Sequence, residues 1–564
     1  MLKKKEYLRA ELAHLKKLDA QRREGTRFLA CGFTSERARS PCDMLVHFLL
    51  LGDTALLSAS FSKGTDVADA VPLPLVVTGI PELDVVLRGG LPMYRLHLLE
   101  GAPGTGKTTI GLRFLIDGVR TADRCLYVTF SESTDEIVSA ARTHGWDVGG
   151  IDFFELVPDE AQTAKQQTVL YPAEIEFDET VRRIIARVEA TRPDRIVIDG
   201  VSELRLLARD PRSYRRQLLS LKRFLQGRCI TTILLDDLRF GDDGDLHNLM
   251  HGVISLDSLE RDYGAARRRL RIVKMRGTNF MSGWHDYALV PGEVMVFPSL
   301  IADEHASDVY GEPLSSGSKG LDEIIGNGLD RGTATMLIGP SGVGKSSLAL
   351  SYALVGARNG EQVAYFAFDE AYETFLRRGQ SLGLNPEPAL ASGRLAWRRM
   401  NPSRISPGEF VWAVRREVED KDARVVVIDS INSYLSTMPE ERSLITHLHE
   451  LLTYLNRRGV VTIIILAQQG VVGDVENPID LSFLSDTVLL LRFFEATGRL
   501  RRALSVMKRR TGAHDTAIHE YRLSSQGVEV GAPLRDLQGI FTGVPIYSGS
   551  PANLIVDSSD GPRP

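Results

Sequence analysis

The chain has 564 residues, of which 25% are charged and 43% hydrophobic, and its formal net charge at pH 7 is -5. One hydrophobic core does not support this length, so two or more domains of ordinary soluble composition are expected. The acidic balance argues against nucleic acid as the main partner, and the longest apolar run of the N-terminal region, Met44 to Leu51, is too short to span a membrane. The four cysteines show no C-x-x-C spacing, which favours a reducing, cytoplasmic location over a metal site.

Residues 1–75 form an N-terminal extension that we expect to be helical or partly disordered. Apolar residues recur there at helical spacing among lysines and arginines, which predicts an amphipathic helix: Leu8, Leu12, Leu15 and Leu18. Such a helix is either an oligomerisation or partner arm, or a solvated helix that rests on the first domain. Pro72 and Pro74 mark the boundary that follows it.

A phosphate-binding motif opens the first predicted domain, residues 76–297. Residues 101–108 read Gly-Ala-Pro-Gly-Thr-Gly-Lys-Thr and fit G-x-x-x-x-G-K-[ST], between a short apolar run and an amphipathic helical segment. In such a loop, backbone N–H groups surround phosphate oxygens, the lysine reaches the β- and γ-phosphates, and the final hydroxyl ligates Mg²⁺. The motif therefore predicts a nucleotide site formed by Gly101, Gly104, Thr105, Gly106, Lys107, Thr108 and Thr109, with Thr108 as a metal ligand.

Short apolar runs alternate with helical segments after this loop, which is the pattern of a mostly parallel sheet covered by helices. Asp199 ends one run, where a carboxylate holds Mg²⁺ in P-loop proteins, although an Asp that caps the next helix has the same placement. Glu132 follows an earlier run and is predicted to orient or deprotonate the attacking water. Lys274 and Arg276, late in the domain, are predicted to neutralise phosphoryl charge on a neighbouring subunit; the alternative is a solvated basic strand edge.

These features recur in a second domain, residues 313–530, after a linker at 298–312. Its loop, residues 339–346, follows the first by 238 residues, and the same offset relates Glu132 to Glu370, which indicates a duplicated domain. The nucleotide-contacting residues predicted here are Gly339, Gly342, Val343, Gly344, Lys345, Ser346 and Ser347. Ser346 and Asp429 are the predicted Mg²⁺ ligands, and the predicted catalytic groups are Asp369, Glu370, Lys508 and Arg510.

The regular pattern fades near the C-terminus. Residues 531–564 are rich in glycine, proline and serine, so a flexible tail is expected there. Such a tail is a candidate docking segment for protein signalling partners.

With these elements in place the chain resembles the KaiC family, the two-domain RecA-like ATPases known from cyanobacterial clocks and wider bacterial signalling. The resemblance covers roughly residues 76–545 and rests on the motifs at residues 78–80, 89–92, 128–132, 274–278 and 531–535. It implies an α/β fold of two tandem RecA-like P-loop NTPase domains, each a mostly parallel sheet flanked by helices. It also implies homo-hexameric rings that bind ATP and Mg²⁺ between subunits, hydrolyse ATP slowly, and use the matching lysines and arginines in trans.

Two departures from the family pattern affect the predicted chemistry. The family usually has two adjacent glutamates after the second strand, whereas this chain has Ser131 before Glu132 and Asp369 before Glu370. Hydrolysis in the first domain is therefore expected to be impaired or to depend on Glu132 alone. Clock members phosphorylate an adjacent Ser-Thr pair in the second domain, of which this chain keeps Ser482 as the candidate phospho-acceptor.

Three hypotheses follow. The leading one is a ring-forming, ATP-hydrolysing signalling protein, to which Ser/Thr autophosphorylation at Ser482 would add a kinase activity. The second is a DNA recombination or repair ATPase of the RadA or DnaB sort, because a shared core fold does not fix function. The third is a non-enzymatic scaffold that senses nucleotide, which the serine at position 131 favours.

Overall fold

The structure is a computed structural model, and it describes most of the chain after residue 72. The described residues are 73–564 except 157–171, 207, 209, 238–243, 261–263, 306, 308, 310, 437–442, 469–480, 497, 536, 541–545 and 548–564. The predicted N-terminal amphipathic helix and the last part of the predicted tail lie outside the described residues. Within the described part, no helix is both long enough and apolar enough to cross a bilayer.

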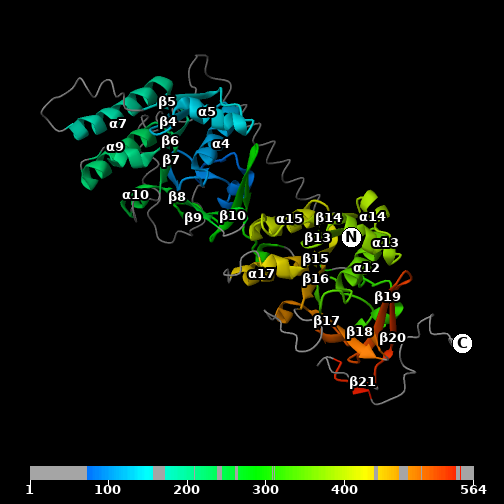
Figure 1. The fold of residues 1–564 in the computed structure, drawn as a ribbon. Helices are drawn as coiled ribbons and strands as arrows, with labels where there is room; N and C mark the ends of the chain where they lie inside the picture. Colours follow the sequence, from blue (N-terminus) through cyan, green and yellow to red (C-terminus); the bar gives the residue numbers. More distant parts are fainter. Residues whose placement is uncertain are drawn as a thin grey trace, which may run out of the picture. The chain divides into compact units, whose positions relative to one another are not determined.

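The first repeat contains a nine-stranded sheet in the order β11-β10-β9-β8-β3-β7-β6-β4-β5 (Figure 1). Strands β3 to β8 run parallel to one another, and β9, β10 and β11 continue the sheet in antiparallel fashion. The central parallel strands are near-continuous apolar runs because helices cover both faces of the sheet. The nine strands of the sheet, parallel and antiparallel together, are β3 (Leu96–Gly101), β4 (Cys125–Thr129), β5 (Ile151–Glu155), β6 (Arg195–Asp199), β7 (Thr231–Asp237), β8 (Gly252–Leu259), β9 (Arg267–Met275), β10 (His285–Val290) and β11 (Glu293–Phe297).

Helices cover the two faces of this sheet and form two hydrophobic layers. On one face Phe114 packs with Tyr127 and Val197, and on the other Leu221 packs with Leu126. A two-stranded ribbon of β1 (Leu75–Val76) and β2 (Leu91–Pro92) precedes β3. The helices are α3 (Pro81–Val86), α4 (Lys107–Arg120), α5 (Thr134–Thr143), α7 (Pro172–Thr191), α8 (Val201–Leu206), α9 (Pro211–Gly227) and α10 (Gly244–Leu249).

The second repeat has the same topology, with strand order β14-β13-β15-β16-β12-β17-β18-β19-β20. This identity of strand order confirms the predicted fold class of two tandem α/β domains. The strands are β12 (Ala334–Gly339), β13 (Gln362–Ala367), β14 (Leu395–Arg399), β15 (Ala423–Asp429), β16 (Val461–Ala467), β17 (Thr487–Ala496), β18 (Arg499–Arg509), β19 (His519–Ser524) and β20 (Gly527–Pro533). The helices are α11 (Lys319–Ile325), α12 (Lys345–Arg358), α13 (Tyr372–Ser381), α14 (Glu387–Ala391), α15 (Pro407–Glu419), α16 (Ile431–Ser436) and α17 (Ser443–Arg457), with short 3₁₀ turns η2 (Ala302–Glu304) and η3 (Ser482–Leu484).

Regular structure continues past residue 530, where the sequence places the end of the second domain. Strand β20 runs to Pro533, and β21 (Leu537–Gln538) pairs with β22 (Ile546–Tyr547). The physical reason is a small buried cluster in which Leu534, Leu537 and Ile540 pack against Phe494. The first residues of the predicted tail therefore belong to the second domain.

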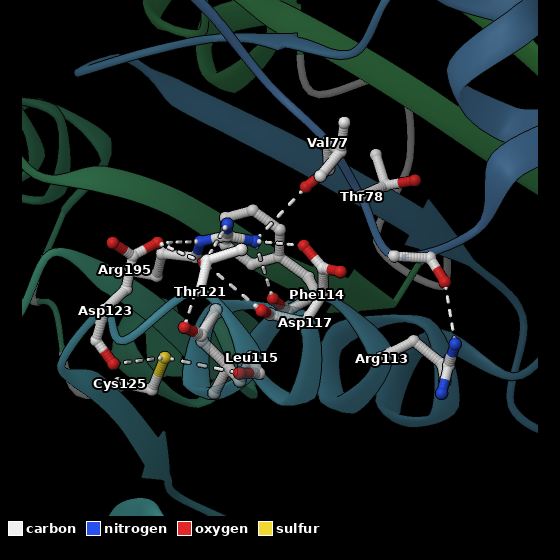
Figure 2. A network of polar contacts seen from close by, with 12 residues as sticks. Val77, Thr78, Arg113, Phe114, Leu115, Asp117, Thr121, Asp123, Cys125 and Arg195 are labelled. Carbon is white, nitrogen blue, oxygen red and sulfur yellow. Dashed lines mark hydrogen bonds and ion pairs between the residues drawn. The ribbon is translucent and has the colours of Figure 1, made fainter.

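A buried arginine ties α4 to the central strands of the first repeat (Figure 2). The Arg195 side chain is 4% exposed, and its Nε donates to Asp123 Oδ2 at 2.8 Å. Its Nη1 donates to the carbonyl oxygens of Phe114 (3.0 Å) and Val77 (3.2 Å). Burial raises the pKa of the neighbouring Cys125 thiol to about 12, which disfavours the reactive thiolate form. Because Arg195 begins β6, the network fixes the strand that carries Asp199 at its other end.

Candidate functional site

Each P-loop connects a buried central strand to the helix that follows it. Gly106 and Gly344 precede α4 and α12 with φ angles of 91° and 112°, in the left-handed region that favours glycine. A β-carbon on Gly106 would lie 2.7 Å from Leu289 Cδ1, so the loop has no room for a side chain there. In this arrangement the first-turn N–H groups of each helix point toward the loop, which is the geometry of an anion site.

A tyrosine from the antiparallel part of each sheet holds the P-loop backbone. The Tyr287 hydroxyl donates to the carbonyl oxygen of Thr105 at 2.5 Å, and the Tyr521 hydroxyl donates to that of Val343. Both tyrosines are buried, and burial raises their pKa above the ordinary value. Sequence reasoning missed this pair, although the tyrosines are related by the same 234-residue offset as Lys274 and Lys508.

The two P-loop lysines make similar contacts with their loops but differ in one ion pair. Lys107 Nζ donates to the carbonyl oxygen of Gly101 at 2.8 Å and pairs with the Asp237 carboxylate at 2.7 Å. Lys345 Nζ donates to the carbonyl oxygens of Gly339 (2.8 Å) and Pro340 (2.7 Å). Gly101 lies opposite Asp237 in the β3–β7 pairing, and Gly339 lies opposite Ala467 in the β12–β16 pairing. The second repeat therefore has no carboxylate at the position of Asp237.

The hydroxyl that ends each P-loop motif contacts the predicted Mg²⁺-binding aspartate. Thr108 Oγ1 donates to Asp199 Oδ2 at 3.0 Å. In the second repeat Ser346 lies close enough to Asp429 to lower the pKa of that carboxyl. Burial raises the pKa of both aspartates, whereas hydrogen bonds lower it, including those from Tyr127 to Asp199 and from Tyr365 to Asp429. A hydroxyl and a carboxylate are the hard oxygen donors that Mg²⁺ prefers. The donor set in both repeats fits that ion.

The predicted catalytic carboxylates differ between the repeats in their surroundings. Asp369 Oδ2 accepts a hydrogen bond from Ser430 Oγ at 2.8 Å, directly after the strand that ends in Asp429. Glu370 instead forms two hydrogen bonds with Arg378, at 2.9 and 2.6 Å. Asp369 is therefore held by the residue that follows Asp429. Glu370, whose charge also raises the pKa of Asp429, is paired with an arginine that the sequence pattern did not single out.

In the first repeat Glu132 lines a cavity of about 410 Å³ next to the P-loop. Lys107, Thr108, Asp199 and Ser131 share this cavity, as do three carboxylates that sequence reasoning missed: Glu203, Asp236 and Asp237. Burial raises the pKa of Glu132, and the nearby negative charge of Asp199 raises it further. The cavity thus brings the P-loop together with the predicted Mg²⁺ ligands and Glu132, whereas Lys274 and Arg276 are not among its lining residues.

The predicted cations lie near the other end of the sheet from the P-loop of their own repeat. Lys274 pairs with Val253 of β8, which pairs with Leu98, three residues before the end of β3 at Gly101. Three strand residues span about 10 Å, so along the strand direction Lys274 lies about 10 Å from the start of its own P-loop. Lys508 has the same placement through Val488 and Met336.

Backbone carbonyl groups hold these cations in both repeats. Lys274 donates to the carbonyl oxygen of His247, and Arg276 donates to that of Asn248 at 3.2 Å. Lys508 donates to the carbonyl oxygens of Ser482 (3.0 Å) and Ser485 (2.7 Å), and Arg510 donates to that of Phe483 at 3.1 Å. The candidate phospho-acceptor Ser482 therefore lies beside the cations of its own repeat.

Comparison with known proteins decides the family. The model of the KaiC ATPase domain matches this chain twice, at residues 76–301 and 314–535. The chain belongs to the KaiC family of ATPases. It is 25% identical over 488 residues to the circadian clock protein KaiC3 of Synechocystis sp., covering 84% of this chain and 94% of that protein.

Two further KaiC relatives cover similar shares of the chain. The circadian clock oscillator protein KaiC of Synechococcus elongatus is 25% identical over 528 residues, which is 89% of this chain and 96% of that protein. The KaiC protein of Thermosynechococcus vestitus is 26% identical over 504 residues, or 85% of this chain and 92% of that protein. The alignments span both repeats, so this chain is a KaiC-like ATPase with two P-loop domains.

Proposed function

We propose that this KaiC-like protein binds ATP with Mg²⁺ at both P-loops and hydrolyses it. The observation that carries the proposal is the hydrogen bond from the Thr108 hydroxyl of the P-loop to Asp199, which ends β6. Ser346 lies correspondingly close to Asp429, at the end of β15, and lowers its pKa. Thr108 with Asp199, and Ser346 with Asp429, would hold Mg²⁺, which when bound neutralises phosphate charge. Lys107 and Lys345 would leave their loop carbonyl oxygens to bind the phosphates.

Incubation with γ-labelled ATP and Mg²⁺ tests this proposal, with free phosphate and protein-bound label counted in the same sample. We expect Lys107→Ala and Lys345→Ala each to remove part of the phosphate release, and the double variant to remove all of it. Circular dichroism of each variant controls for misfolding. Phosphate release that persists in the double variant would refute hydrolysis at these sites.

We further propose that the subunits assemble into a ring and that ATP lies between neighbouring subunits. The number of subunits proposed is six, as the resemblance to the KaiC family implies. The support is the position of the cations, which lie too far along the sheet to serve their own P-loop. Exposed apolar side chains adjoin both lysines: Val273 is 40% exposed and Met507 is 61% exposed. Sedimentation with and without ATP tests assembly, and a protein that stays monomeric with ATP and Mg²⁺ contradicts it.

Autophosphorylation is the second candidate activity. Ser482 lies in η3, and its carbonyl oxygen is bound by Lys508, so the hydroxyl-bearing turn and the trans cations share one edge of the repeat. In a ring, this edge would meet the second-repeat ATP of a neighbour. Protein-bound label that disappears in both Lys345→Ala and Ser482→Ala would support the kinase activity, and free phosphate without any protein-bound label would exclude it.

A further inference from the structure

Two serine hydroxyls position the catalytic carboxylate candidate of the second repeat. Asp369 follows β13, and its two carboxylate oxygens accept hydrogen bonds from Ser430 and Ser433. Ser430 directly follows Asp429, and Ser433 lies in the first turn of α16. The carboxylate is thereby held at the carboxyl ends of β13 and β15, where a parallel α/β sheet binds its ligand.

All three positions differ in the first repeat. Where the second has Asp369, Ser430 and Ser433, the first has Ser131, Gly200 and Glu203. The strands β4 and β6 pair as β13 and β15 do, so the three residues lie at equivalent places. The first repeat therefore has the hydroxyl of Ser131 where the second has the carboxylate of Asp369. On the following helix the types are reversed, with the carboxylate of Glu203 where the second repeat has the hydroxyl of Ser433.

The local geometry brings the exchanged pair together. Ser131 and Glu203 line the same 410 Å³ cavity as Lys107, Thr108 and Asp199. A β-carbon on Gly200 would lie 3.6 Å from Ser131 Oγ and 3.7 Å from Glu203 Cγ, so the two side chains flank this glycine. The Glu203 N–H donates to the Gly200 carbonyl oxygen at 2.9 Å, which fixes the start of α8 and the direction from which the side chain enters.

We propose that Glu203 is the catalytic carboxylate of the first repeat and replaces the acid that Ser131 lacks. The inference rests on the proposed ATP hydrolysis at this site. The water oxygen bonds to the γ-phosphorus while the bond from that phosphorus to the β–γ bridging oxygen breaks, which leaves ADP and phosphate. The proton of the water passes to the Glu203 carboxylate and then to solvent. The Ser131 hydroxyl donates a hydrogen bond that orients this carboxylate or the water.

Glu132 has a different place in this scheme. Its counterpart by sequence offset is Glu370, which is bound to Arg378 and is not the residue held by Ser430 and Ser433. The first repeat has Ala140 at the position of Arg378, so the arginine that pairs with Glu370 has no equivalent at that position. Glu132 acts beside Asp199 on the electrostatics of the metal side, and Glu203 acts on the water.

Site-specific turnover of the first repeat tests this assignment. The parent protein carries Lys345→Ala, so that only the first site contributes, and both phosphate release and binding of a fluorescent ATP analogue are measured. Glu203→Gln keeps the size of the side chain and removes its charge; we expect turnover to fall about 100-fold with ATP affinity within about threefold of the parent. Glu203→Ser is expected to lose as much, and adding Ser131→Asp to it restores the second-repeat pair and recovers most of the turnover.

The possible outcomes separate this inference from the proposed function. If both Glu203 variants turn over at the parental rate while Glu132→Gln is inactive, Glu132 is the base and the Glu203 assignment is wrong, although ATP hydrolysis stands. If the parent neither binds the analogue nor loses turnover on Lys107→Ala, the proposed function of the first site itself fails. Retained analogue binding by Glu203→Gln shows that its loss of turnover does not come from misfolding.

Discussion

Asp237 distinguishes the P-loop lysine of the first repeat from that of the second. Its carboxylate pairs with Lys107 at 2.7 Å, so nucleotide phosphates must compete with it for the ammonium group. We expect Asp237→Ala, which introduces the residue found at position 467, to tighten ATP binding at the first site about three- to tenfold. Titration of a fluorescent ATP analogue in a Lys345→Ala background measures the affinity. Weaker binding would mean that Asp237 supports the nucleotide site, for example through the metal.

The second P-loop lysine makes ATP binding dependent on pH. Burial lowers the pKa of Lys345 to about 8, while the phosphates require the charged ammonium form. ATP affinity at the second site is therefore nearly complete at pH 7, is halved near pH 8 and continues to fall above it, by about tenfold between pH 7 and pH 9. The same titration in a Lys107→Ala background, at constant ionic strength, measures this dependence.

A matched variant checks the cause of this pH dependence. Ala467→Asp places a carboxylate where the first repeat has Asp237, and an opposite charge favours the protonated lysine. We expect the loss of affinity to move to higher pH in this variant, while the affinity at pH 7 falls. An unchanged profile would show that a group other than Lys345 titrates.

At the scale of elements, the two repeats stabilise the junction of α4 or α12 with the sheet in different ways. The first buries Arg195 against Asp117 and Asp123, whereas the second has the buried Val425 at the position of Arg195. Removing one partner of a buried ion pair leaves an uncompensated charge, so Arg195→Ala should lower the free energy of unfolding of the first repeat by about 3–5 kcal/mol. Hydrogen exchange of first-repeat peptides during denaturation measures this loss. Val425→Ala, a cavity change in the second repeat, is the control, and its effect should stay within second-repeat peptides.

The sequence predicts the elements that are local and misses those that depend on packing between elements. Each P-loop is one continuous stretch, and Asp199 and Asp429 end apolar strands, so the motif and the strand pattern suffice to place them. Asp237 meets Lys107 only because β7 lies beside β3 in the sheet, although the two strands are far apart in the sequence. Strand order and side-chain geometry have no signature in a single sequence.

Glu203 and Arg378 are two helical residues whose contacts a single sequence does not predict. Glu203 acts from the first turn of a short helix, and only the pairing of β4 with β6 brings that turn near Ser131. Arg378 reaches Glu370 across the first two turns of α13, an ion pair that rests on side-chain conformation. The internal repeat contained the one available signal, because aligning positions 131 and 203 with 369 and 433 reveals the exchanged residue types.

At the scale of the whole molecule, the position of the cations means that in the proposed ring each second-repeat site would be formed by two subunits. Lys508 and Arg510 lie near the opposite end of the sheet from Lys345, so one chain would supply the P-loop and its neighbour the cations. A P-loop substitution and a cation substitution can then be placed on two different chains. A chain with Lys345→Ala still offers its cations, and a chain with Lys508→Ala and Arg510→Ala still offers its P-loop.

Mixing these two chains tests the arrangement in a Lys107→Ala background, which removes turnover by the first repeat. The chains are combined as equal amounts of monomer before ATP is added, and phosphate release is measured after assembly. In a randomly mixed ring, about a quarter of the interfaces pair an intact P-loop with intact cations, so we expect about a quarter of the turnover of the Lys107→Ala parent. Each chain assembled alone should be inactive. If the mixture is as inactive as its components although sedimentation shows mixed rings, the cations act on the ATP of their own subunit or take no part in the reaction.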